Sequence, residues 1–337
     1  MPPVTSSFPL TSADVYRAAA SLRGVAAYTP ILSSPDLDQV AGCAVACKAE
    51  ALQRAGSFKF RGAYNAVAAL CEQGHPRGVV GASSGNHAQA LALAGRLLDV
   101  PVIVVVPQDA PAIKVSGARS HGAKIVTYDR HRDDREAITA DLAAIHGYMI
   151  VPSANAMPVM AGAGTAALEL LAQAPDARLI LVPVGGGGLA AGTAVAAKAV
   201  NRQVQVIGVE PRAGADTAAS LRARTRVTLP EVPGTIADAL RHTSPAPLAW
   251  AVNQIMLDDV VTVTDGQIAE AMRWAFELLK VVVEPSGAVA LAALSCLRRP
   301  AGKVGVIISG GSVDLDTFYQ VLATEPDRTQ VGAEPAR

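Results

Sequence analysis

The sequence predicts an α/β protein of two domains, each built on a largely parallel sheet flanked by helices. The chain has 337 residues, more than one hydrophobic core usually serves. Half of the residues are apolar and 17% are charged, which is typical of compact globular proteins. Short β-branched runs alternate with alanine-rich segments, and these runs are apolar throughout. That pattern is typical of parallel strands that are covered on both faces.

The order of the elements follows from these runs. Strands are expected over residues 77–83, 101–107, 123–129, 178–185, 204–210 and 302–311. Alanine-rich stretches predict helices over residues 87–98, 160–173, 188–200 and 265–279. Ligands of such folds bind at the carboxyl ends of strands. Three of the expected strands end in turn-forming residues, "SSGNH", "GGGG" and "SGGS", so we expect the site there.

Composition and charge exclude several classes of function. Lys plus Arg and Asp plus Glu both number 29, and no basic stretch interrupts the chain, so nucleic acid and anionic membranes are not expected partners. The N-terminus lacks the pattern of a signal peptide, and the longest apolar runs are too short to span a bilayer. Cys43 and Cys47 have no second pair to complete a metal site. We therefore expect a cytoplasmic protein with reduced thiols.

The stretch "GSFKFRG" places Lys59 between two phenylalanines. One interpretation is an edge strand in which Lys59 points to water and Phe58 and Phe60 point to the core. The other is a lysine in an apolar pocket, where desolvation lowers its pKa and makes it a nucleophile toward a carbonyl. The stretch alone leaves both open.

Four consecutive glycines, Gly185 to Gly188, lie between an expected strand and an expected helix. Glycines there let backbone N–H groups approach a phosphate at the helix N-terminus. One interpretation is a dinucleotide site, with Glu210 about 20 positions further on as the ribose ligand. The others are a cup for a single phosphate and a tight turn without a ligand. The spaced glycine fingerprint of a dinucleotide site fits only loosely.

A second turn carries several small or polar residues in succession. It consists of Ser83, Ser84, Gly85, Asn86 and His87. Helix capping explains any one serine or asparagine in it. The whole succession is better suited to anchoring a small carboxylate.

Four motifs together resemble a known family. "SFKFRGA", "SSGNHAQA", "VGGGG" and "SGGSVDL" occur in this order, and the resemblance runs from about Thr29 to Phe318. They resemble the pyridoxal-phosphate enzymes of the serine/threonine dehydratase and serine racemase family, which have the tryptophan-synthase-β fold type. The resemblance implies that the cofactor lies in a cleft between two domains and that Lys59 binds its aldehyde.

The resemblance also implies roles for other residues. Phe58 would pack against the pyridine ring, and Asn86 would hydrogen-bond its phenolic oxygen. The phosphate would be held by Gly185, Gly186, Gly187 and Gly188. Ser309 would meet the pyridine nitrogen with a neutral hydroxyl, which leaves the ring a weaker electron sink and favours prompt β-elimination.

A metal site is implied by "VEPRAGAD". Its carboxylates, Glu210 and Asp216, and the Gly214 carbonyl are hard oxygen ligands that suit Mg²⁺ or another divalent cation. The metal-dependent branch of the family has the same spacing.

The substrate pocket departs from the family pattern at several positions. Ala163 stands where relatives have a glutamine, with Asn155 as the uncertain neighbouring contact. His242 and Thr243 stand where racemase-like members have serines. Arg135 occupies the position where several relatives bring an arginine toward a dicarboxylate. The alternative is a helix-surface arginine paired with acids.

Ser84 bears on the subtype. Racemases and hydroxyaspartate dehydratases resemble this chain in having serine there, whereas many threonine dehydratases have alanine. A hydroxyl across the cofactor from Lys59 would exchange a proton on the opposite face, or it would only bind the substrate carboxylate with Ser83, Asn86 and His87.

These observations predict a large domain over residues 1–52 and 151–325, a small domain over 53–150 and a tail over 326–337. The expected function is a pyridoxal-phosphate-dependent ammonia-lyase that converts a β-hydroxy amino acid, threonine or serine first, to a 2-oxo acid and ammonia. The alternatives are a serine racemase, a hydroxyaspartate dehydratase or racemase and, remotely, an NAD-dependent oxidoreductase. A homodimer or homotetramer is expected.

Overall fold

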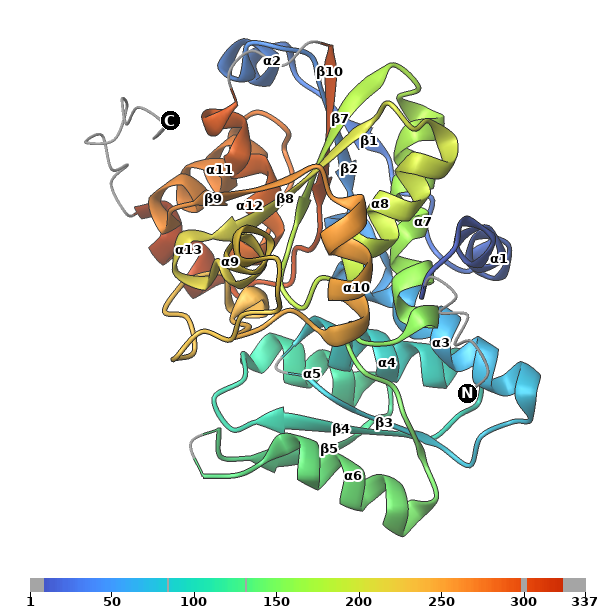
Figure 1. Ribbon diagram of the computed structural model, residues 1–337. Coiled ribbons are helices and arrows are strands. Elements are labelled where there is room, and N and C mark those ends of the chain that lie inside the picture. Colours follow the sequence, from blue (N-terminus) through green and yellow to red (C-terminus); the bar gives the residue numbers. More distant parts are fainter. Residues whose placement is uncertain (1–8, 84, 131, 298–301, 324–337) are drawn as a thin grey trace.

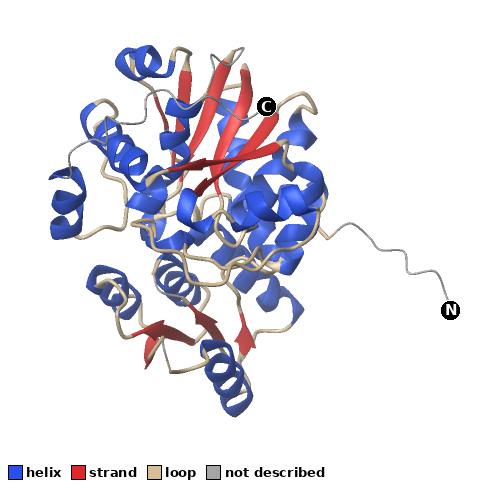
Figure 2. Cartoon of the chain, turned by 60° about the vertical axis from the view of Figure 1, so that its left-hand side comes forward, coloured by secondary structure: helices blue, strands red, loops and turns tan. Residues whose placement is uncertain are grey.

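The computed structural model describes residues 9–83, 85–130, 132–297 and 302–323. They contain two sheets, one above the other in Figure 1, with helices on the faces of each. Figure 2 shows the larger sheet in the upper part of the molecule and the smaller one below it. The predicted α/β class with two largely parallel sheets is confirmed.

The larger sheet has six strands in the order β1-β2-β10-β7-β8-β9. Only β1 and β2 pair antiparallel; the other neighbours are parallel. The strands are β1 (Ile31–Leu32), β2 (Val45–Ala49), β7 (Ala177–Pro183), β8 (Gln205–Pro211), β9 (Asp259–Val263) and β10 (Lys303–Ile308). The smaller sheet has four parallel strands in the order β5-β4-β3-β6. They are β3 (Val79–Ala82), β4 (Val102–Pro107), β5 (Lys124–Tyr128) and β6 (Met149–Ile150).

Helices cover both faces of both sheets. Their bounds are α1 (Ser12–Leu22), α2 (Pro35–Ala41), α3 (Lys59–Gln73), α4 (Asn86–Leu97), α5 (Ala112–Ser120), α6 (Arg135–His146), α7 (Met157–Gln173), α8 (Gly188–Val200), α9 (Asp216–Ala223), α10 (Pro247–Met256), α11 (Asp265–Glu277), α12 (Pro285–Ala292) and α13 (Leu315–Ala323). No helix in these described residues is long and apolar enough to cross a bilayer.

The continuous apolar strands are explained by this double coverage. In β4, Val102, Val104 and Val106 pack in one cluster with the alanines and leucines of α4. The alternate residues Ile103 and Val105 pack in another cluster, against the apolar side chains of α6. Because successive side chains point to opposite faces, a strand buried on both faces has no polar position.

All six predicted strands and all four predicted helices form, with small shifts at their ends. Four further strands were not predicted, namely β1, β2, β6 and β9. Two of them have only two residues, and β2 contains Lys48, whose polar head interrupts the apolar run although it is buried. All strands of the smaller sheet fall within residues 79–150, inside the predicted small domain, but the domain boundaries themselves stay a prediction.

Two helices of the larger half touch through their backbones. A Cβ on Gly192 of α8 would lie 2.2 Å from the Met160 oxygen and 2.6 Å from the Gly164 nitrogen of α7. Only glycine permits this approach. The four consecutive glycines, Gly185 to Gly188, are called the glycine loop below. The packing of α8 on α7 matters for the site because α8 begins at the last of them, Gly188.

Replacing Gly192 by alanine should destabilise the protein. The substitution gains about 1 kcal/mol of helix propensity, but the clash with backbone atoms outweighs it, and a net loss of about 1–3 kcal/mol is expected. Chemical denaturation measures the change. Gly234→Ala is the control, because nothing lies within 4 Å of a Cβ there. Equal stability of the two variants would contradict the close approach of α7 and α8.

Candidate active site

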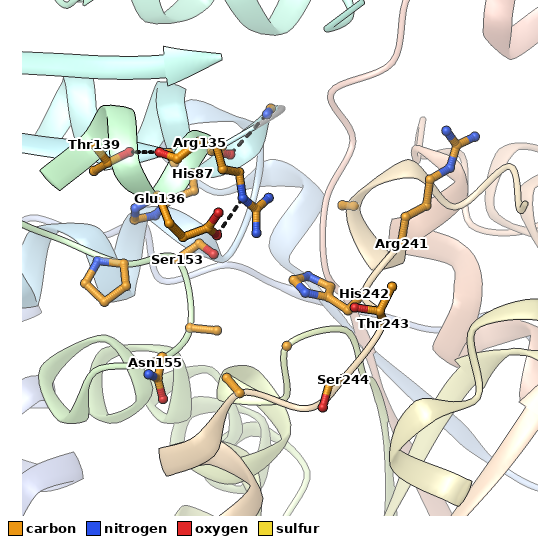
Figure 3. Close-up of a pocket in the computed structure, with 18 of the residues that line it drawn as sticks. His87, Arg135, Glu136, Thr139, Ser153, Asn155, Arg241, His242, Thr243 and Ser244 are labelled. Atoms are coloured by element: carbon orange, nitrogen blue, oxygen red, sulfur yellow. Dashed lines mark hydrogen bonds and ion pairs between the residues drawn. The ribbon is translucent and has the colours of Figure 1, made fainter. Parts of the chain in front are cut away.

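A cavity of about 830 Å³ is lined by residues from both halves of the molecule. Its walls include Lys59, the turn after β3, the first turn of α6 and residues 238–247. Figure 3 shows this cavity with the residues that project into it. A smaller cavity of about 40 Å³ shares part of that lining. It is bordered, among others, by Phe58, Lys59, Asn86, Gly185, Gly186, Gly187, Gly188 and Ser309. The structure thus brings together every residue that the sequence assigned to the cofactor.

Lys59 begins helix α3, so the edge-strand interpretation of its stretch is wrong. Its ammonium donates a hydrogen bond to the Ser153 carbonyl at 2.8 Å and lies 5.1 Å from the centre of the Phe58 ring. Burial lowers the pKa of Lys59 to about 8, and the charge of Glu284 opposes that shift. A substantial fraction of the amine is therefore neutral near pH 8, as a nucleophile requires.

Backbone bonds tie the Lys59 segment to the end of β10. The Phe58 N–H donates to the Ser309 carbonyl at 3.0 Å, and the Gly311 N–H donates to the Gly56 carbonyl at 2.9 Å. These contacts place the first and last motifs side by side although they lie far apart in the sequence. Ser309 is the first residue after β10, and it lines the smaller cavity.

The first turn of α3 is also anchored by a buried ion network. Arg61 forms ion pairs of 2.7 Å with Glu50 and with Glu169, and Lys48 pairs with Glu169 at 2.7 Å. The side chains of Arg61, Glu50 and Lys48 have no exposed surface. Removing one partner of such a network leaves an uncompensated buried charge. Lys59 is two residues from Arg61, so the network fixes where its side chain starts.

Neighbouring groups pack closely against the glycine loop (Gly185 to Gly188) where it does not face the cavity. A Cβ on Gly185 would lie 3.0 Å from His242 Cδ2, and one on Gly188 would lie 2.9 Å from the Ala154 oxygen. Gly187 has a φ of 88°, a left-handed conformation that favours glycine. Its carbonyl accepts a hydrogen bond from the Asn253 amide at 3.1 Å. The loop thus presents backbone at the N-terminus of α8, which suits a phosphate.

The turn between β3 and α4 has its residues at the cavity wall. Ser83, Gly85, Asn86 and His87 all line the cavity, and Ser84 lies outside the described residues. Asn86 donates its amide to Glu284, while its amide oxygen is buried and has no partner in the described part of the chain. Burial, together with the charge of Lys59, lowers the pKa of His87 to about 4. This imidazole is therefore neutral at physiological pH.

Arg135 pairs with an acid in the first turn of α6 and also lines the cavity. Asp134 caps α6 by accepting the N–H groups of Glu136 and Ala137 at 2.9 and 3.1 Å, which places Arg135 in the first turn. Its Nε lies 2.7 Å from the Glu136 carboxylate, and its side chain also lines the cavity. Figure 3 shows it on the wall opposite His242.

His242, Thr243 and Asn155 line the same part of the cavity. Burial and the charges of Lys59 and Arg135 lower the pKa of His242 to about 4, so its ring is neutral. Asn155 accepts the Leu248 N–H at 2.9 Å. Ala163 is buried in α7.

The predicted metal ligands are close together at the end of β8. Glu210 accepts hydrogen bonds from the Thr217 and Ala218 N–H groups at 2.9 and 2.8 Å. Both carboxyl oxygens of Asp216 are buried and accept no hydrogen bond from a described residue. Burial and the neighbouring Glu210 raise the pKa of Asp216 to about 8. Two neighbouring carboxyl groups whose pKa values are raised by burial fit a divalent cation. A cation here would need the Gly214 carbonyl as well, because the described residues contain no cluster of three His, Cys, Asp or Glu side chains.

Sequence reasoning missed Lys114, Ser153, Asp238 and Glu284. Lys114 of α5 pairs with Asp238 at 2.7 Å and with Glu284 at 2.9 Å. Its position in a polar helical segment gives no sign of a buried partner. The one available signal was Pro285, which marks the first residue of a helix and so places Glu284 just before it.

Known proteins resemble this chain over nearly its whole length. Residues 22–310 match the family described as pyridoxal-phosphate dependent enzyme. An L-threo-3-hydroxyaspartate ammonia-lyase from a Pseudomonas species is 42% identical over 311 residues, which cover 92% of this chain and 97% of the relative. Another from Saccharomyces cerevisiae is 40% identical over 319 residues, covering 94% and 98%.

Similarity to a solved structure agrees with these matches. Maize serine racemase has a TM-score of 0.89 to this chain at 38% identity, covering 93% of this chain and 97% of the other. The family match favours a single-phosphate cup over the dinucleotide interpretation of the glycine loop. The chain belongs to the pyridoxal-phosphate enzymes of the serine/threonine dehydratase and serine racemase family, as its four motifs predicted.

Proposed function

We propose that the protein is a pyridoxal-phosphate-dependent ammonia-lyase that acts on a β-hydroxy amino acid with a second carboxylate, 3-hydroxyaspartate being the first substrate to test. The observation that carries this choice is Arg135, which lines the cavity opposite His242. Two relatives that bear the name L-threo-3-hydroxyaspartate ammonia-lyase support it. Threonine and serine, which the sequence favoured, have no second carboxylate for Arg135 to bind. They stay in the substrate panel.

Residues of both halves would hold the cofactor. Gly185, Gly186, Gly187 and Gly188 would bind its phosphate, Phe58 would pack on the ring, and Asn86 and Ser309 would bind its phenolic oxygen and ring nitrogen. The buried Asn86 oxygen, which has no partner among the described residues, and the glycines at the wall of the smaller cavity fit such a group. When bound, pyridoxal phosphate supplies an electron-withdrawing ring that makes the α-proton of an attached amino acid acidic.

The protein's own groups then do three things. The turn of Ser83, Gly85, Asn86 and His87 would bind the α-carboxylate at the N-terminus of α4. Arg135 would bind the second carboxylate, so that the substrate is held at both ends. Lys59, released from the cofactor, would take the α-proton, because its lowered pKa leaves a neutral amine. Loss of the β-hydroxyl and hydrolysis give a 2-oxo acid and ammonia.

The racemase alternative rests on Ser84 and on the similarity to maize serine racemase. It requires a proton donor on the face opposite Lys59. The substrate panel decides between the two activities if both oxo acid and product enantiomer are followed. Cytoplasmic location and assembly as a homodimer or homotetramer stay predictions.

We also propose that Glu210, Asp216 and the Gly214 carbonyl hold Mg²⁺ or another divalent cation. The two buried carboxyl groups support this, because each would otherwise be neutral or uncompensated. The cation would stabilise the loop between β8 and α9.

Lys59→Ala should abolish covalent cofactor binding and turnover. The amine is needed for both the bond to the cofactor aldehyde and the proton transfer. Borohydride reduction followed by mass spectrometry should find the cofactor on Lys59 of the wild type and nowhere on the variant. Lys124→Ala, at an exposed lysine of β5, is the control and should keep both. Turnover by Lys59→Ala at more than a trace would remove this lysine from the mechanism.

Arg135→Met should lower kcat/KM for 3-hydroxyaspartate on the order of 100-fold, because one end of a charged substrate loses its partner. Turnover of serine or threonine should change by no more than about threefold. Arg132→Met is the matched control, since the Arg132 side chain is 84% exposed and pairs with the nearby Asp129. An equal loss for all substrates would show that Arg135 supports the fold and not the specificity.

Removing the cation should destabilise the protein. A chelator should lower the melting temperature of the wild type, and Mg²⁺ or Ca²⁺ should restore it by linkage. Asp216→Asn should melt at one temperature with and without chelator, since the amide is a poor ligand. Identical melting of the wild type in both conditions would leave Glu210 and Asp216 as an acid pair without metal.

A further inference from the structure

A buried ion bridge crosses the cleft between the two halves of the molecule. Lys114 lies in α5, which packs on the smaller sheet. Its ammonium is 2.7 Å from the Asp238 carboxylate and 2.9 Å from the Glu284 carboxylate. Glu284 directly precedes α12, which packs on the larger sheet. Asp238 begins a short 3₁₀ turn, Asp238–Leu240, which packs on α12. The side chains of Lys114 and Glu284 are only 3% and 2% exposed, so water screens this bridge little.

The bridge continues to the candidate cofactor site. The second oxygen of Glu284 accepts the Asn86 amide, and Asn86 opens α4 on the side of the smaller sheet. Asp238 accepts the Ser286 hydroxyl at 3.2 Å, and that hydroxyl accepts the Ala239 N–H at 3.0 Å. The chain of contacts therefore passes from one half to the other and back, and one end of it is a residue that lines the cofactor cavity.

Gly85 makes room for this arrangement. A Cβ there would lie 2.4 Å from Lys114 Cδ and 3.3 Å from its Nζ. The Lys114 stem therefore runs directly against the turn that precedes α4, and its ammonium lies beside that turn. This close approach of the Lys114 stem explains a glycine at position 85.

The charges of the bridge are unequal. One ammonium faces two carboxylates. Burial raises the pKa of Glu284, and the charge of Lys114 works against that shift, whereas Asp238 adds to it. The negative charge of Glu284 also acts on Lys59, where it opposes the lowering of the lysine pKa by burial. The groups that face Glu284 are thus Lys114, Asp238, Lys59 and the Asn86 amide.

We propose that Lys114 is a positioning residue of the active site: it joins the two halves across the cleft and keeps the Glu284 carboxylate charged and directed at Asn86. Asn86 then holds one orientation toward the cofactor. Lys114 also lines the larger cavity, but in this role it makes no contact with the cofactor. It acts through Glu284, and the assignment does not depend on which amino acid the enzyme takes.

The test compares Lys114→Met, Glu284→Gln and the double variant. Methionine keeps the apolar stem that passes Gly85 and removes only the charge. Glutamine at position 284 keeps an oxygen that accepts the Asn86 amide, but it carries no charge that needs Lys114 as a partner. Lys198→Met is the matched control, because Lys198 also pairs with a carboxylate at 2.8 Å, that of Asp258, but with its side chain 20% exposed and within one half.

The first measurement is titration of each apoprotein with pyridoxal phosphate, followed by fluorescence. Lys114→Met should bind at least about tenfold more weakly than wild type, because the unpaired Glu284 turns away from Asn86 or takes up a proton. The double variant should recover to within about threefold of Glu284→Gln. Lys198→Met should bind as the wild type does.

The second measurement is the melting temperature of the apoproteins against pH. Without Lys114 the folded-state pKa of Glu284 lies further above its unfolded value, so stability is lost as the pH rises through that interval. The stability deficit of Lys114→Met relative to wild type should therefore grow as the pH rises above the ordinary pKa of a glutamate side chain. The stability deficit of the double variant should grow less with pH, because this variant has no carboxylate at position 284.

Three results would overturn the proposal. They are cofactor binding by Lys114→Met within about twofold of wild type, a double variant that binds as weakly as Lys114→Met, and a deficit that does not change with pH. If Lys114 only supported the fold, the double variant would bind the cofactor as weakly as Lys114→Met, and the stability deficit would not change with pH. If Lys114→Met does not fold, the double variant decides: tight cofactor binding supports the proposal, and weak binding refutes it.

Discussion

The central constraint on this molecule is that a buried lysine has to remain partly neutral among groups that have to remain charged. Lys59 loses hydration in the cleft, and this lowers its pKa to about 8. An unpaired carboxylate beside Lys59 would raise its pKa again. The Glu284 carboxylate lies near Lys59, but it is paired with Lys114 at 2.9 Å. Two further acids near the start of α3 are paired with Arg61 and Lys48. At Lys59 the loss of hydration thus outweighs the charge of Glu284, which acts to raise the pKa of this lysine.

Close backbone contacts are the second requirement, and they explain where the glycines lie. Gly192 lets α8 touch α7, and Gly187 takes the left-handed conformation that turns the chain into α8. A Cβ on Gly287 of α12 would lie 2.0 Å from the Gly310 oxygen, so α12 also packs directly on the turn after β10. These contacts bring two helix starts and a strand end to one place, where backbone amides can meet a small anionic group.

The sequence predicted those features that short motifs determine and missed those that depend on distant pairing. The glycine loop, the Ser83 turn and the Lys59 segment were found because each has a local pattern that few other functions need. Strand β2 was missed because Lys48 makes it look polar. Its ammonium is in fact buried against the Thr29 carbonyl at 2.6 Å. Lys114 and Glu284 are likewise 170 positions apart in number, and no spacing rule links them.

The pocket shows why the family alone does not determine the substrate. The proposed cofactor-binding groups come from backbone and from short motifs. The rest of the cavity is lined by Arg135 of α6 on one wall and by His242 on the opposite wall. The neutral His242 ring offers one donor and one acceptor, and the Arg135 guanidinium offers a charge. Under the proposed function, this lining suits a substrate with an anionic end, because the Arg135 guanidinium can form an ion pair with a second carboxylate and not with a methyl group.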